Sequence, residues 1–169
     1  ISKFHPNAHF ILAFADIVRD KPTLLSFLPT HSEIIEIKDL EIPHFQDFAF
    51  RYNTYEFCCN MKAFSIGYAM KVSKHKKLIY CDSDLLFFAP MSESIGDLEN
   101  NDILITPQLT HLPETAIVEA RNGMNILTGT YNGGFIGFRI NKESEHFVKW
   151  WQERLLTGGH DAPLSRMFG

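Results

Sequence analysis

The stretch that most constrains the fold is a capped helical pattern that leads into a short apolar run. Asn53 stands three residues before Glu56, as in a capping box, and apolar residues then follow at helical spacing. This pattern predicts a helix over residues 54–72. The β-favouring residues 78–81 come next and end in two carboxylates. The sequence therefore predicts a helix followed by a strand with acids at its carboxyl end, where ligands bind in open α/β sheets.

Further apolar runs predict the rest of an α/β fold, a mixed central sheet flanked by helices in a single domain over residues 1–169. The run 9–15 does not alternate, which predicts burial on both faces. Asn141 is expected to cap a helix reaching about residue 156, with Trp150 and Trp151 in the core. The remaining expected elements are strands at 33–38, 102–106 and 131–140, short helical turns within 44–55, a partly helical segment at 92–101 and a helix at 114–121.

Composition excludes several classes of protein. With 45% hydrophobic residues and fifteen phenylalanines, the chain is not of a disordered type. Its net charge is −4 and its one basic cluster, residues 71–77, is short, which argues against a nucleic-acid partner. No apolar run approaches the ~20 residues of a membrane-spanning helix. Three cysteines without a C-x-x-C spacing indicate reduced thiols, so we expect a cytoplasmic protein.

The strongest candidate for chemistry is Asp82-Ser83-Asp84. If the backbone stays extended through Ser83, side-chain alternation places both carboxylates on one face, close enough for one divalent cation to bridge them. Mg²⁺ or Mn²⁺ takes carboxylate oxygens and keeps positions open for phosphate and water. Such a cation would hold a diphosphate and stabilise its charge as it leaves. The alternative is a pair of solvated acids at a strand end.

A second candidate group follows the chain toward its end. Asn132 precedes Gly133 and Gly134, where an amide could reach a ligand hydroxyl or could instead satisfy its own turn. The glycines indicate that the backbone bends or approaches a neighbour closely. His160 and Asp161 could supply a further metal ligand or a base, or could be solvated loop residues.

Weaker candidates complete the set. Gln108 and His111 fall in a long excursion and are candidates for substrate contacts. A Cys/His nucleophile pair is not expected, because Cys58 and Cys59 fall on the predicted helix and Cys81 ends a strand, without an activating charge nearby.

Taken in order, these motifs resemble a known family. The segments 77–91, 103–107 and 131–139, with the helix that carries the two tryptophans, are similar to nucleotide-sugar-dependent glycosyltransferases of the GT-A fold, and most of all to bacterial family-8-like enzymes. The resemblance implies a hexosyltransferase, possibly a retaining one, that transfers sugar from a UDP-sugar to a hydroxyl of a carbohydrate or glycoconjugate acceptor.

The same resemblance implies roles for individual residues. Asp82 and Asp84 would bind Mn²⁺ or Mg²⁺ that bridges the donor diphosphate, with Ser83 beside them. Asn132 and Gly133 would lie near the donor sugar or the acceptor, so the resemblance makes Asn132 a candidate catalytic residue.

The chain departs from the family's pattern at both ends. Family members begin with a strand that helps to bind the base, and this chain is expected to start after it. They also continue past the tryptophan helix with an Asp-Gln type motif and a distal histidine ligand. Here only His160 and Asp161 follow, so we expect part of the C-terminal region to be missing, with His160 as the metal ligand and Asp161 as the catalytic acid or base.

Two other classes of protein stay open. A phosphotransferase of the haloacid-dehalogenase type would use an Asp of the D-x-D as nucleophile, but it expects Thr or Val where Leu86 stands and places the motif on its first strand. A non-catalytic domain would keep the scaffold as a binding or assembly module.

Overall fold

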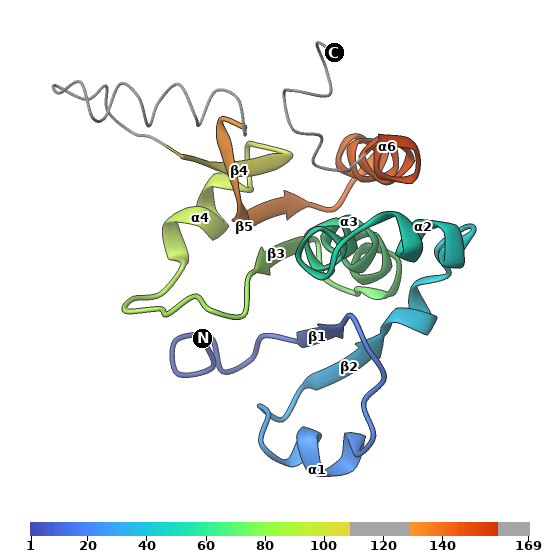
Figure 1. The fold of residues 1–169 in the computed structure, drawn as a ribbon. Helices are drawn as coiled ribbons and strands as arrows, with labels where there is room; N and C mark the ends of the chain where they lie inside the picture. Colours follow the sequence, from blue (N-terminus) through green and yellow to red (C-terminus); the bar gives the residue numbers. More distant parts are fainter. Residues whose placement is uncertain (109–128, 159–169) are drawn as a thin grey trace, which may run out of the picture. The chain divides into compact units, whose positions relative to one another are not determined.

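The structure, a computed structural model, describes residues 1–108 and 129–158. The predicted helix at 114–121 lies outside these ranges. The chain is α/β, as expected, and it divides into two compact units. The first unit comprises Ile1–Lys74 and the segment from Glu145 onward, and the second comprises His75–Ser144. Each unit has its own hydrogen-bonded sheet (Figure 1).

The sheet of the first unit is a parallel pair, β1 (Phe10–Phe14) and β2 (Ser32–Glu36), in register from Phe10↔Ser32 to Phe14↔Glu36. The short helix α1 (Lys21–Ser26) connects the strands as a parallel pairing requires, and Asp20 caps it by accepting from the Thr23 N–H at 3.1 Å (Figure 1). The expected burial of β1 on both faces is wrong. None of its residues is fully buried, and within the described residues it pairs with β2 alone.

The carboxyl end of β2 holds a buried charge. Glu36 is 1% exposed, and its Oε1 accepts from the Val18 N–H at 2.7 Å. Its Oε2 lies 2.6 Å from Lys38 Nζ and 3.2 Å from Lys21 Nζ. The Lys38 ammonium, followed by the Val18 N–H, lowers the pKa of Glu36 to about 2. We name these four residues the Glu36 cluster, and the sequence analysis did not anticipate it.

The long helix of the first unit is α3 (Thr54–Val72), which begins and ends where the sequence predicts. Its capping box is complete, because Asn53 Oδ1 accepts from the Glu56 N–H and Glu56 Oε2 accepts from the Asn53 N–H, both at 2.9 Å. The 3₁₀ turn η1 (Ile37–Leu40) and α2 (Phe45–Arg51) precede it; α2 matches the turns expected in this segment.

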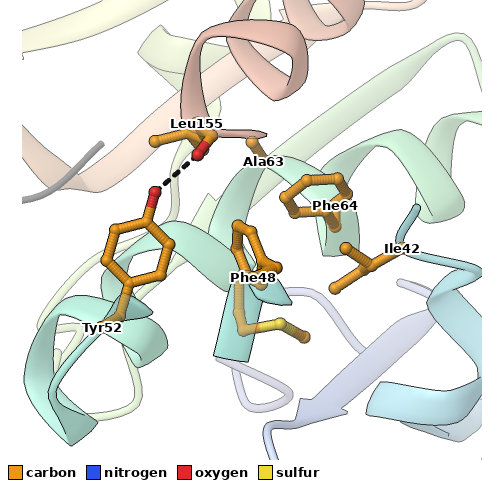
Figure 2. Packing of buried hydrophobic residues seen from close by; sticks show 7 residues of the cluster. Ile42, Phe48, Tyr52, Ala63, Phe64 and Leu155 are labelled. Atoms are coloured by element: carbon orange, nitrogen blue, oxygen red, sulfur yellow. Dashed lines mark hydrogen bonds between the residues drawn. The ribbon is translucent and has the colours of Figure 1, made fainter. Parts of the chain in front are cut away.

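The core of the first unit lies between α2, α3 and α6 (Lys142–Gly158) (Figure 2). Phe48 is 2% exposed and packs edge-on against Tyr52 and Phe64, with ring centroids 5.0 and 5.3 Å away. Each such pair contributes about 0.5–1.5 kcal/mol beyond its burial. The Tyr52 hydroxyl donates to the Leu155 carbonyl at 2.5 Å, which ties α6 to this core.

The two tryptophans of α6 differ from the prediction. Trp151 packs against the core, but Trp150 is 48% exposed. Adjacent helical residues point about 100° apart. Because Val148 and Leu155 face the core, Trp151 shares their face and Trp150 does not.

The sheet of the second unit has the strand order β3-β5-β4, with both pairings antiparallel (Figure 1). Its strands are β3 (Lys77–Cys81), β4 (Ile103–Pro107) and β5 (Tyr131–Arg139), each within one residue of its prediction. Helix α4 (Ser92–Asp97) matches the partly helical segment, and Leu98 and Phe138 are fully buried. Parallel and antiparallel pairings thus both occur, but in two separate hydrogen-bonded sheets of the described residues.

Candidate functional site

The two acids lie where β3 ends. Asp82 still belongs to the ladder, since its N–H donates to the Gly134 carbonyl at 2.8 Å. The chain then turns, and the Leu85 N–H donates to the Asp82 carbonyl at 3.3 Å. The condition that the backbone stays extended through Ser83 is therefore not met. Asp82 is half-buried and Asp84 is exposed in the turn, so strand alternation does not set the relation between the two carboxylates.

A tyrosine that the sequence analysis did not single out orients the first acid. The Tyr80 hydroxyl donates to Asp82 Oδ1 at 2.7 Å. Residues two apart on a strand share a face, so β3 itself brings these side chains together. Tyr80 is in turn held in register by pairing with Ile136 on β5. The sequence signal was available as a tyrosine two residues before the acid in a strand.

A bulge in β5 brings the glycine motif to the same place. From Ile105 to Thr106 on β4, the paired residue on β5 shifts from Ile136 to Asn132. Residues 133–135 therefore bulge relative to β4, and the Thr106 hydroxyl stabilises the bulge by donating to the Phe135 carbonyl at 3.0 Å. The expectation that the glycines mark a bend and a close approach is confirmed.

Gly134 is the point of closest approach between the two motifs. A Cβ at this position would lie 2.8 Å from Asn132 Oδ1 and 3.2 Å from Asp82 Oδ2. Because a Cβ would come this close to both oxygens, only glycine lets the Asn132 and Asp82 side chains pack over the β5 backbone here. The antiparallel pairing of β3 and β5 thus brings Asp82, Asn132 and Gly134 together.

Asn132 itself adopts the turn role that the sequence left open. Its Oδ1 accepts from the Gly134 N–H at 2.7 Å, a side chain closing its own turn. The residue is exposed, and its amide nitrogen carries the donors that a ligand hydroxyl would need. Structural and ligand-binding roles are therefore compatible here.

The thiols of Cys58, Cys59 and Cys81 are free, as expected. Burial, and then the neighbouring Asp82 charge, raises the pKa of Cys81 to about 11, so its thiol stays protonated at neutral pH.

The structure describes only some of the other predicted residues. His111, His160 and Asp161 lie outside the described residues. Gln108 is exposed, and its backbone N–H donates to the Thr130 carbonyl at 2.9 Å. Over residues 1–108 and 129–158, no group of three or more His, Cys, Asp or Glu side chains is placed to hold a metal ion.

A pocket of about 370 Å³ lies in the first unit and is lined in part by Asp39, Tyr68 and Gln152. None of the residues predicted to act lines it, so it gives no support to the candidate chemistry. Among the described helices, none combines the length and the apolar character that a membrane crossing requires.

The fold and the site define an α/β protein with an acidic turn at a strand end beside a glycine bulge. It is similar to the uncharacterized protein YfnF of Bacillus subtilis (strain 168), with 27% identity over 115 residues. The match covers 68% of this chain and 38% of YfnF, so the chain spans well under half of that relative's length. No family model matches the chain, and no solved structure matches it significantly.

Proposed function

We propose that the chain is part of a metal-dependent glycosyltransferase of GT-A architecture, which moves a hexose from a UDP-sugar to a hydroxyl of a carbohydrate or glycoconjugate acceptor. One observation carries the proposal. The Asp82 carboxylate follows a strand and packs over buried Gly134, where a side chain would not fit, and a second carboxylate, Asp84, follows in an exposed turn. Two acids so close in sequence at a strand end suit a cation that carries a phosphate ligand.

The donor set fits Mn²⁺ or Mg²⁺. In substrate-phosphate sites Mg²⁺ is bound through one or two carboxylates, and phosphate and water complete its shell. Asp82 and Asp84 together supply two carboxylates, which is enough for such a site without a third protein ligand. When bound, the cation would neutralise the charge that develops on the departing diphosphate.

The other residues have positioning and recognition roles in this proposal. Asp82 is held by the ladder bond to Gly134 and by the Tyr80 hydroxyl, so it presents a fixed carboxylate. The Asn132 amide nitrogen would donate to a hydroxyl of the sugar or the acceptor. His160 and Asp161 remain proposed as a further ligand and a catalytic acid or base.

Calorimetry of UDP binding in MnCl₂ tests the metal role. We expect Asp84→Asn to abolish Mn²⁺-dependent UDP binding, because it removes one anionic ligand. Asp97→Asn is the matched control, since it makes the same change at an exposed acid elsewhere in the second unit and should bind as the unmodified protein does. Equal binding by Asp84→Asn and the control would contradict the metal role.

Thermal shift with UDP-, GDP- and CDP-sugars plus Mn²⁺ then tests the donor class. A ligand at one hundred times its Kd stabilises the folded state by about 2.7 kcal/mol. We expect a UDP-sugar to raise the Tm most. A Tm that no nucleotide sugar changes would favour a non-catalytic module, and hydrolysis of an aryl phosphate that is lost in Asp82→Asn would favour the phosphotransferase class.

A further inference from the structure

The Asp82 carboxylate is fixed from one side by a neutral donor. The Tyr80 hydroxyl holds Oδ1 at 2.7 Å, and the bond is partly buried. The terminal torsion of an aspartate is broad and soft, so an unrestrained carboxylate samples many orientations. A single well-placed hydroxyl removes much of that freedom before any ligand arrives.

The other carboxylate oxygen is set by the backbone of β5. Oδ2 lies 3.2 Å from the place that a Cβ of residue 134 would occupy, and the Gly134 carbonyl accepts the Asp82 N–H at 2.8 Å. The glycine therefore holds the Asp82 main chain, and the absence of a side chain at position 134 lets the Asp82 carboxylate pack against the β5 backbone. A hydroxyl on one oxygen and the glycine backbone beside the other define a direction for the carboxylate.

We propose that Tyr80 and Gly134 are positioning residues that aim the Asp82 carboxylate at the divalent cation. This inference rests on the proposed function, because it concerns the same site. In this proposal each residue acts through Asp82 and contacts neither the substrate nor the cation. Groups that orient metal ligands typically change metal affinity about 10–100-fold when they are removed.

Mn²⁺ binding without nucleotide, measured by electron paramagnetic resonance of free Mn²⁺, is the direct test. We expect Tyr80→Phe to weaken Mn²⁺ binding about tenfold. Without the hydroxyl, part of the binding free energy is used to fix the orientation of the carboxylate. The Tm without metal should change little. A merely structural role for the hydroxyl would lower the Tm and leave the affinity of the folded protein unchanged.

The chain offers a matched control for this variant. The Tyr68 hydroxyl also donates to a carboxylate, that of Glu33 at 3.3 Å, but on the first unit. Tyr68→Phe removes the same kind of bond and should leave Mn²⁺ affinity within twofold of the unmodified protein.

A second variant keeps the test decisive if Tyr80→Phe does not fold. Gly134→Ala should also weaken Mn²⁺ binding, since its Cβ would press on Asp82 Oδ2 and Asn132 Oδ1. Gly96→Ala is its control, because a Cβ at that position meets nothing within 4 Å.

The outcomes separate this inference from the proposed function. If Asp82→Asn abolishes Mn²⁺ binding but Tyr80→Phe and Gly134→Ala bind like their controls, the positioning role is overturned and the metal site stands. If the unmodified protein does not bind Mn²⁺, or Asp82→Asn binds it equally well, both proposals are overturned. The inference is supported if Asp82→Asn abolishes Mn²⁺ binding, Tyr80→Phe and Gly134→Ala weaken it, and the two control variants bind like the unmodified protein.

Discussion

Glu36 and Asp82 are both carboxylates where a strand ends, but their surroundings differ. Glu36 is 1% exposed and meets two lysine ammonium groups and a backbone N–H. Asp82 is half-buried, is held by a neutral hydroxyl, and is followed by the exposed acid Asp84. Two cations thus lie beside the first carboxylate, whereas a second acid follows the other two positions along the chain.

In the proposed function this difference separates a structural carboxylate from a ligand-binding one. Lys38, the Val18 N–H and Lys21 stabilise the charged form of Glu36, which is why its pKa is lowered to about 2. The Tyr80 hydroxyl is a neutral donor that orients Asp82, and the proposed function has Asp82 and Asp84 bind an external cation. If the distinction holds, substitution of Glu36 should affect folding, and substitution of Asp82 should affect binding.

The largest expected effect is on metal binding. We expect Asp82→Asn to abolish Mn²⁺ binding measured by calorimetry, because the amide lacks the charge of a metal-ligating carboxylate. Its Oδ1 can still accept from Tyr80, so the Tm should stay close to that of the unmodified protein. A large fall in Tm would mean that Asp82, like Glu36, is mainly structural.

The converse substitution should affect stability. Glu36→Gln leaves Lys21 and Lys38 close together without their shared carboxylate, so we expect the Tm to fall by several degrees while Mn²⁺ affinity is unchanged. Glu33→Gln is the matched control on the same strand. The Glu33 side chain is 37% exposed, so its substitution should lower the Tm less.

The stabilising effect of the charged Glu36 should depend on pH. The pKa of Glu36 is lowered from 4.5 to about 2 on folding, so the folded state binds fewer protons between these values. Its contribution is complete above about pH 4.5 and is lost as the pH falls through 2. The urea midpoints of the unmodified protein and Glu36→Gln should therefore converge between pH 4.5 and 2.5. A gap that stays constant over this range would contradict the ion-pair explanation.

Local patterns in the sequence predicted most of the elements. The capping box at Asn53 and Glu56 fixed the start of α3, because the two residues satisfy each other's backbone donors wherever the helix packs. The end of β3 and its acids were predicted for a similar reason, since an apolar run and its polar boundary are local properties.

Features that depend on pairing could not be predicted in this way. The Glu36 cluster joins residues from a loop, a helix start and a 3₁₀ turn, and no spacing in the sequence signals that they meet. The turn after Asp82 and the bulge at Gly134 likewise depend on the register between β3, β5 and β4. Sequence reasoning therefore located the motifs in the chain but not the geometry that joins them.

The smallest expected effect concerns the thiol next to the site. Burial is the main cause of the raised Cys81 pKa, about 11, and the Asp82 charge is the second. At pH 8 we expect iodoacetamide to modify Cys81 far more slowly than the exposed Cys58, with both rates measured by mass spectrometry of the folded protein. Asp82→Asn should increase the Cys81 rate slightly, because burial persists while the charge is removed. Asp84→Asn is the control and should leave the rate unchanged, since the Asp84 charge is not among the causes of the shift. If Asp82→Asn and Asp84→Asn increase the Cys81 modification rate equally, the two charges of the turn slow the reaction alike. The Asp82 charge would then have no special effect on the Cys81 thiol.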